Sequence, residues 1–220
     1  MSIFTFTEEN YLKIIYLKLE QNKGQEVNTN DLALHTQTKA ASVTDMLKKL
    51  AEKEVINYVK YQGVTLTPLG QKVALKVIRK HRLWEYFLVE SLGFGWDEVH
   101  QIAEQLEHID SEELTERLAN FLENPQFDPH GDPIPDANGV MPNVSTRKLS
   151  EISVGDTVVM VGVLVHTASF LQLLDSNHVA LGTPIKVEQI NAFDASFVLL
   201  INETEKVFLS HEVVKNVLVK

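Results

Sequence analysis

One stretch constrains the fold most, because it repeats His and Glu at helical spacings: residues 81–108, HRLWEYFLVESLGFGWDEVHQIAEQLEH. His81 and Glu85 are four positions apart, which places them one turn apart on a helix. A second group keeps the i, i+4, i+7, i+8 spacing of one helix face and consists of His100, Glu104, Glu107 and His108. The stretch therefore offers six potential metal ligands.

The second group could also be an ordinary solvated face. An apolar stripe lies opposite it, formed by Val99, Ile102, Ala103, Leu106 and Ile109. The preceding helix favours metal, because His81 and Glu85 fall inside its inward-facing apolar stripe. That stripe is formed by Val77, Ile78, Trp84 and Leu88. A carboxylate on an apolar face is costly unless it is paired or bound to a cation, so we predict metal coordination rather than a lone core salt bridge.

The absence of cysteine limits the chemistry of such a site. With no Cys in 220 residues, disulfides, thiolate zinc sites and iron–sulfur ligation are excluded. Imidazole, carboxylate, amide and water remain as ligands, and this set suits Mn(II), Fe(II) or zinc. The length allows two or three small domains. The sequence has no long apolar run and no secretory leader, so we expect a cytoplasmic protein without a membrane span.

The formal charge of −10 is unevenly distributed along the chain. Residues 1–80 carry twelve Lys/Arg and eight Asp/Glu, whereas residues 81–220 carry eight and twenty-two. The basic part comes first, which suggests a nucleic-acid-binding half joined to an acidic half.

The N-terminal part has the element order of a winged helix. Thr7 is expected to cap a first helix that carries Asn10 in its first turn. A short helix over 31–35, a polar turn and a second helix over about 39–53 follow, which is a helix-turn-helix layout. The next residues predict two strands that turn at Gln62–Gly63.

The second helix of this layout presents small and polar side chains outward. The predicted DNA contacts are Lys39, Ala41, Ser42, Thr44 and Lys48, with Lys60 on the wing touching phosphate. Asp45 also points outward, where an acid can accept a hydrogen bond from a cytosine amino group. A winged helix can instead serve as a protein-interaction module, but the basic charge and the small outward residues favour double-stranded DNA.

The rest of the chain changes from helical to β-rich patterns. Helices are predicted over about 68–91, over 97–109, and from an Asp110–Glu113 capping box to residue 122. Residues 124–143 hold five of the seven prolines and predict a linker or a wrapped loop.

Three residues of that loop could bind metal, namely Asp128, His130 and Asp132, but turn chemistry explains them adequately and is the favoured interpretation. Beyond the loop, short β-rich runs with one helical insert predict a small SH3-like barrel. The runs are 157–165, 185–193, 197–202 and 206–209, with the insert at about 169–176.

This order of features resembles the diphtheria toxin repressor family of metal-dependent transcriptional regulators. The resemblance rests on the winged helix, RKHRLWE, VHQIAEQLEH, a PHGDPIP loop and the β-domain, and it covers almost the whole chain. It implies a mostly α protein with a small β domain: a winged-helix domain (1–72), a helical metal-binding and dimerisation domain (73–140) and an SH3-like barrel (150–220). In that family, metal binding to a homodimer fixes the two winged helices at the spacing of a palindromic operator.

Transferred by position, the resemblance implies two metal sites. The primary, activating site would consist of Asn10, Glu104, Glu107 and His108, and the ancillary site of His81, Glu85 and His100. His166 occupies a position that reaches back to the ancillary metal in three-domain members, and Ser169 is its weaker companion. Glu104 stands where iron-responsive members carry Cys, as in members resembling the manganese transport regulators, and Asn10 is neutral where those have Asp or Met.

We therefore expect a homodimeric repressor, not an enzyme, that is activated by Mn(II) or Fe(II) and controls metal uptake. A metal-dependent hydrolase is one alternative, but H-E-x-x-H is absent, and Glu104-x-x-Glu107-His108 lacks the leading His of H-x-x-E-H. A metal-independent winged-helix adaptor is another. Titration with Mn(II) separates the three, because an adaptor predicts no binding and a hydrolase predicts turnover.

Overall fold

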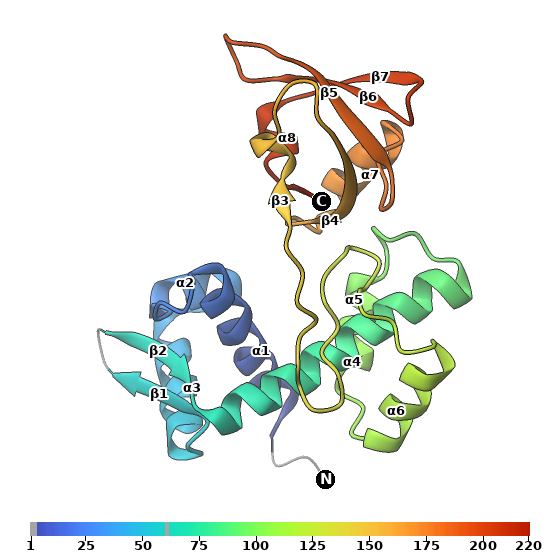
Figure 1. Cartoon of the computed structure of the whole chain (residues 1–220). Coiled ribbons are helices and arrows are strands. Elements are labelled where there is room, and N and C mark those ends of the chain that lie inside the picture. The colour runs from blue at the N-terminus through green and yellow to red at the C-terminus, as the bar shows by residue number, and fades with distance from the viewer. Residues whose placement is uncertain (1–3, 60–61) are drawn as a thin grey trace. The chain divides into compact units, whose positions relative to one another are not determined.

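The computed structural model describes residues 4–59 and 62–220, which form two compact units (Figure 1). The first unit consists of Met1–His81, Leu106–Asn120 and Pro135–Val140. The second consists of Arg82–Gln105, Phe121–Ile134 and Met141–Lys220. Each unit is assembled from separate stretches of the chain, because the helical middle of the sequence contributes to both.

The N-terminal part of the first unit is a winged helix, as predicted. Its elements are α1 (Phe6–Gln21), α2 (Thr29–His35), α3 (Ala40–Glu52), β1 (Ile56–Val59) and β2 (Gly63–Leu66). The two strands pair antiparallel with Ile56 opposite Leu66, and Val27 adds an isolated bridge to Val64. The apolar side of α3 is buried as the helical period requires, since Val43, Leu47 and Leu50 are all fully buried. Its other side is left for contacts outside the unit.

The start of α1 differs from the prediction. Thr5, not Thr7, is the N-cap: its Oγ1 accepts from the Glu8 N–H at 3.3 Å, and its own N–H donates to Glu8 Oε2 at 2.8 Å. This capping box needs an acid three residues after the cap, which Thr5 has and Thr7 lacks. The helix therefore begins earlier, and Asn10 lies in its second turn rather than its first.

The longest helix, α4 (Pro68–Leu92), contributes residues to both units. Proline suits its first position, where no N–H is needed for a helical hydrogen bond. Gly70 is required in the same turn, because a Cβ there would lie 1.9 Å from the carbonyl oxygen of Val55.

The two following helices are α5 (His100–Leu106) and α6 (Glu112–Phe121). The helix predicted over 97–109 is shortened at both ends, so Glu107 and His108 lie in the turn that follows α5. The predicted capping box at Asp110 is also wrong, because the Ser111 side chain accepts from the Leu114 N–H at 3.1 Å. The Ser111 hydroxyl, and not the Asp110 carboxylate, therefore caps the start of α6.

The C-terminal part of the second unit is the predicted small β-domain. Its elements are β3 (Arg147–Lys148), η1 (Leu149–Glu151), β4 (Thr157–Val163), α7 (Ala168–Ser176), β5 (Pro184–Ile190), β6 (Phe197–Ile201), β7 (Glu205–Leu209), α8 (His211–Val214) and β8 (Val217–Val219). The six strands pair in the order β3-β8-β4-β5-β6-β7, all antiparallel. Residues alternate across β6, where Phe197, Leu199 and Ile201 face the core. Four elements of this part were not predicted, namely β3, η1, α8 and β8. Each has two to four residues and is too short to show a period.

The proline-rich loop belongs partly to this unit, where residues 126–134 lie against β4. The Val163 N–H donates to the His130 carbonyl at 3.0 Å. Gly131 has φ +86°, and a Cβ there would meet the Val161 oxygen at 2.1 Å. Glycine is therefore needed for both the backbone conformation and the close approach. Among the described residues, no helix is both long and apolar enough to cross a membrane.

Candidate metal centres and DNA-binding face

A buried cluster in the second unit joins α4 to the proline-rich loop. We call it the Glu85 centre, and it consists of Glu85, Asp128 and His130, whose ligand atoms lie within 4.8 Å of one another. These residues are only 2%, 3% and 1% exposed. His130 Nδ1 lies 3.6 Å from Glu85 Oε2 and 4.0 Å from Asp128 Oδ1. Burial of three such groups together is costly unless a cation compensates the carboxylates.

The orientation of the His130 ring leaves one nitrogen available to a cation. Nε2 donates to the Trp96 carbonyl oxygen at 2.8 Å, and a carbonyl can only accept, so Nε2 carries the hydrogen. In the neutral ring Nδ1 then holds a lone pair, and Nδ1 is buried without a hydrogen-bond partner among the described residues. This is the arrangement of a metal-ligating histidine fixed by a backbone carbonyl.

Turn chemistry accounts for only part of the loop. Asp128 Oδ1 does accept from the backbone N–H groups of His130 and Asp132, at 2.8 and 3.0 Å. The same carboxylate also belongs to the Glu85 centre, so Asp128 and His130 combine the predicted turn with a position at a candidate metal site. The turn orients the His130 ring toward Glu85.

The electrostatics of the centre also favour a cation. Burial, reinforced by Asp132 and Glu85, raises the pKa of Asp128 to about 8. Burial alone would lower the pKa of His130, but the carboxylates of Glu85 and Asp128 raise it to about 9. Arg82 supplies part of the compensation, since Nη2 lies 3.2 Å from Asp132 Oδ2 and Nε lies 3.8 Å from Asp128 Oδ2. Without a metal, the remaining negative charge must be met by protons.

Two further predicted ligands adjoin the Glu85 centre. The His166 ring stacks on His130 with centroids 4.6 Å apart, and its Nε2 is buried, has no hydrogen-bond partner among the described atoms and lies 3.9 Å from Asp132 Oδ2. Burial lowers the pKa of His166, which favours the neutral, ligating imidazole. His100 Nδ1 lies 3.3 Å from Glu85 Oε1 on a more exposed side. Glu104, one turn along α5, lies 3.8 Å from His100 Nε2.

Another group lies in the first unit, and we call it the Glu107 centre: the predicted ligands Asn10, His81, Glu107 and His108, together with Lys13. Glu107 is fully buried, and its Oε2 lies 2.5 Å from His81 Nδ1. The resemblance assigned His81 to the ancillary site, whereas its ring here contacts Glu107. Glu104, implied for the same primary site, belongs to the other unit.

His108 and Asn10 offer donor atoms at this centre. His108 Nδ1 donates to Glu9 Oε2 at 2.7 Å, which leaves Nε2 to face Glu107 Oε1 at 3.6 Å. Asn10 Oδ1 is buried and has no hydrogen-bond partner within the described part of the chain. An amide oxygen, an imidazole and a carboxylate fit Mn(II) or Fe(II).

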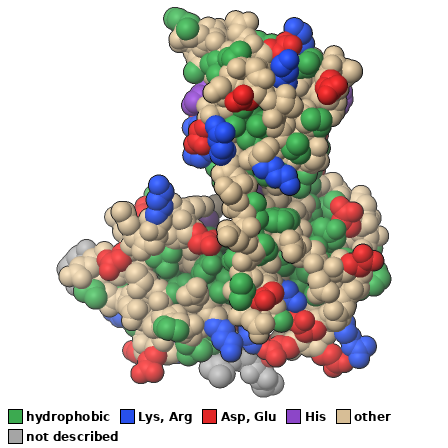
Figure 2. Space-filling model, viewed as in Figure 1, with side chains coloured by type: hydrophobic (Ala, Val, Ile, Leu, Met, Phe, Trp, Pro, Cys, Tyr) green, Lys and Arg blue, Asp and Glu red, His purple; other side chains and the backbone are tan. Residues whose placement is uncertain are grey.

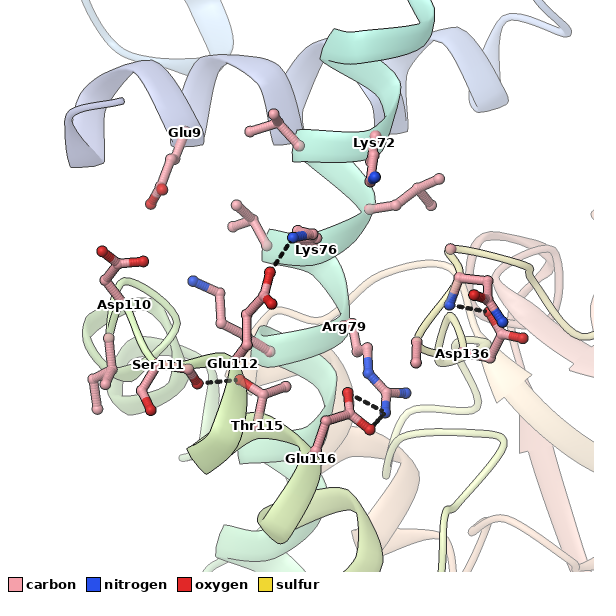
Figure 3. Close-up of a pocket in the computed structure, with 18 of the residues that line it drawn as sticks. Glu9, Lys72, Lys76, Arg79, Asp110, Ser111, Glu112, Thr115, Glu116 and Asp136 are labelled. Carbon is pink, nitrogen blue, oxygen red and sulfur yellow. Dashed lines mark hydrogen bonds and ion pairs between the residues drawn. The ribbon is translucent and has the colours of Figure 1, made fainter. Parts of the chain in front are cut away.

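Sequence reasoning did not identify Glu9 and Lys13 at this centre. Both are buried charged residues on α1, and a helical period would have placed Lys13 one turn from Asn10. Glu9 also lines a cavity of about 650 Å³ in the first unit (Figure 3). Across that cavity, Lys76 pairs with Glu112 and Arg79 Nη2 lies 3.2 Å from Glu116 Oε1, which braces α4 against α6.

The face of α3 predicted to bind DNA is open. Ala41, Ser42, Asp45 and Lys48 are exposed, and Lys39 is the N-cap residue of the helix. Thr44 is half-buried, and its hydroxyl donates to the Ala40 carbonyl at 2.9 Å. Lys48 Nζ lies 3.4 Å from Asp45 Oδ1, so these two charges partly offset each other. Lys60 falls outside the described residues. Figure 2 shows basic and acidic side chains interspersed on the visible face.

Comparison with known proteins identifies the class to which this fold and these centres belong. Residues 4–64 match the iron dependent repressor N-terminal DNA binding domain, 67–136 match the iron dependent repressor metal binding and dimerisation domain, and 147–220 match the FeoA domain. The class is that of metal-dependent, DNA-binding transcriptional regulators.

Individual relatives are regulators of the same class. The iron-dependent repressor IdeR of Mycobacterium leprae is 31% identical over 164 residues, 70% of either chain. The HTH-type transcriptional regulator MntR of Geobacillus kaustophilus is 32% identical over 120 residues, 54% of this chain and 83% of that one. A solved manganese-dependent transcriptional repressor in complex with manganese has a TM-score of 0.85 at 33% identity, over 96% of this chain and 98% of that one. The chain belongs to the iron-dependent repressor family, which confirms the resemblance to the diphtheria toxin repressor family and the expected function of a metal-dependent transcriptional repressor.

Proposed function

We propose that this chain is a homodimeric transcriptional repressor activated by Mn(II) or Fe(II), and that the Glu85 and Glu107 centres are its two metal sites. One observation carries the proposal: the Nδ1 atom of His130 is buried beside two carboxylates and has no hydrogen-bond partner in the described structure. Two buried carboxylates that face a buried imidazole nitrogen are costly unless a cation compensates them, so the arrangement favours a role for Nδ1 as a metal ligand.

The donor atoms favour the two proposed metals. The Glu85 centre offers two carboxylates and the His130 imidazole, with His166 and His100 beside them. The Glu107 centre offers an amide oxygen, a carboxylate and the His108 imidazole. Oxygen and imidazole ligands without thiolate suit Mn(II) and Fe(II), and the named relatives are iron-dependent and manganese-dependent regulators.

A bound divalent cation would supply positive charge that holds ligands from separate elements together. At the Glu85 centre those elements are α4, the 126–134 loop and the chain after β4, which carries His166. At the Glu107 centre they are α1 and the turn after α5. Fixing α1 bears directly on the winged helix, because α1 is part of it.

The DNA-binding part of the proposal follows from the face of α3. Lys39, Ala41, Ser42, Thr44 and Lys48 would contact a palindromic operator, with Lys60 on phosphate. A two-fold dimer presents two recognition helices to two half-sites, which is why the operator is expected to be palindromic. We place this activity in the cytoplasm, where it would control metal uptake, and we propose that the protein catalyses no reaction.

Calorimetric titration with Mn(II) tests the proposal. The metal-stripped chain should bind Mn(II) at two sites, and His130→Ala should lose one of them. The control is His178→Ala, because His178 is an exposed histidine of the β-domain that pairs with Glu205 at 2.7 Å and is a member of neither centre. Glu107→Ala should retain the His130-dependent site but lose metal-activated DNA binding. Full Mn(II) binding in His130→Ala would show that the Glu85 centre is only a buried polar network.

A further inference from the structure

Lys13 is a buried lysine whose ammonium binds the central carboxylate of the Glu107 centre. Its Nζ donates to both oxygens of Glu107, at 2.7 and 2.8 Å. Lys13 is 6% exposed and Glu107 is fully buried, so solvent screens the pair little. Since His81 Nδ1 lies 2.5 Å from Glu107 Oε2 as well, the chain itself already compensates this carboxylate.

The neighbouring potential ligand atom, the amide oxygen of Asn10, is not compensated in this way. Asn10 lies one turn before Lys13 on α1, and its Oδ1 is buried without a hydrogen-bond partner among the described residues. A divalent cation could use this amide oxygen without breaking a hydrogen bond among the described residues. To use Glu107, it must share the carboxylate with an ammonium that already contacts both oxygens.

We propose that Lys13 is an internal cation that competes with the divalent metal for Glu107 and so sets the metal concentration at which the Glu107 centre fills. The inference rests on the proposed function, because it assumes that Glu107 is a metal ligand. Two positive charges on one carboxylate repel each other, and burial strengthens the repulsion. The metal-free chain keeps the favourable Lys13–Glu107 pair, whereas the loaded chain must weaken it.

A competing lysine and a merely structural lysine would change metal affinity in opposite directions. A group that stabilises the metal-free form more than the loaded form lowers metal affinity, by linkage. A lysine with a purely structural role would instead help to hold Glu107 in place, so its removal would weaken metal binding. The sign of the affinity change therefore distinguishes competition from simple support.

The test uses the full chain in a His130→Ala background, so that Mn(II) titration reports the Glu107 centre. Lys13→Gln keeps a hydrogen-bond donor and removes the charge. It should lower the melting temperature of the metal-free chain and tighten Mn(II) binding on the order of tenfold or more. Lys13→Arg keeps the charge and offers a fork that suits a carboxylate, so its Mn(II) affinity should equal or fall below that of the background chain.

The matched control is Lys53→Gln. Lys53 Nζ lies 2.8 Å from Glu8 Oε2, a second lysine–glutamate pair in the same unit that does not include Glu107. This change should lower the melting temperature and leave Mn(II) affinity unchanged.

Unchanged or weaker Mn(II) binding in Lys13→Gln would overturn the competition. If Lys13→Gln does not fold without metal, Lys13→Arg decides, because tighter binding in that variant would be incompatible with a competing charge. If the background chain itself binds no Mn(II), the proposed function fails, which is a different result from failure of the Lys13 inference.

Discussion

Replacing Gly131 with alanine should push the loop that carries Asp128 and His130 away from the barrel. The new Cβ would lie 2.1 Å from the Val161 oxygen and 2.5 Å from the Gly162 Cα. Both are backbone atoms, so no side chain can rotate aside. The loop must move by roughly 1 Å or more to restore an ordinary contact distance.

Two costs add in this variant. Gly131 has φ +86°, and a residue with a Cβ pays about 1–2 kcal/mol in a left-handed conformation. Displacement also breaks the 3.0 Å hydrogen bond from the Val163 N–H to the His130 carbonyl. Loss of such a buried bond costs about 1–3 kcal/mol. The free energy of unfolding should therefore fall by about 2–5 kcal/mol in total.

Gly182→Ala is the matched control. Gly182 has φ +83°, but a Cβ there would meet nothing within 4 Å, so only the conformational cost applies. Thermal denaturation should show a larger loss for Gly131→Ala, at about 2–4 °C for each kcal/mol. Gly131→Ala should also weaken Mn(II) binding at the Glu85 centre, and Gly182→Ala should not. Equal losses of melting temperature in the two variants would refute the close-packing argument.

Two other predictions concern the winged helix. Lys48→Ala should weaken DNA binding similarly for all sequences and reduce the salt dependence of log affinity by about one phosphate contact, measured by fluorescence anisotropy across a salt series; an unchanged salt slope would remove Lys48 from the interface. Thr5→Ala should destabilise the chain by about 1 kcal/mol in urea denaturation, whereas Thr7→Ala should be nearly neutral; the reverse order would restore Thr7 as the cap.

The helical period predicted the parts of the site that lie on helices. Glu85 was expected on the buried side of a long helix because its neighbours one turn away are apolar, and it is 2% exposed in the structure. The same reasoning extended α5 too far, because the i, i+7 and i+8 spacings also suit side chains in the turn after a helix. Glu107 is buried even though the helix ends before it.

The candidate ligands in the loop could not be predicted in the same way. Asp and Gly beside Pro are typical of turns, and Asp128 does form one, so the sequence pattern alone does not separate a turn from a ligand. His130 reaches Glu85 because residues 126–134 fold against β4. These are contacts between segments that are distant in sequence, and a local sequence pattern does not reveal them. The pairing of Lys13 with Glu107 is also long-range, across 94 positions of the chain.

The central claim is that metal binding controls DNA binding, and operator affinity with and without metal tests it most directly. A DNA fragment selected from a random library by the Mn(II)-loaded chain would serve as the probe in fluorescence anisotropy. Adding Mn(II) to the chelator-treated chain should tighten binding about 5- to 150-fold, the usual range of coupling between two sites. Glu107→Ala should bind with the metal-free affinity whether or not Mn(II) is present. Equal affinity of the metal-free and Mn(II)-loaded wild-type chain for this fragment would contradict the account.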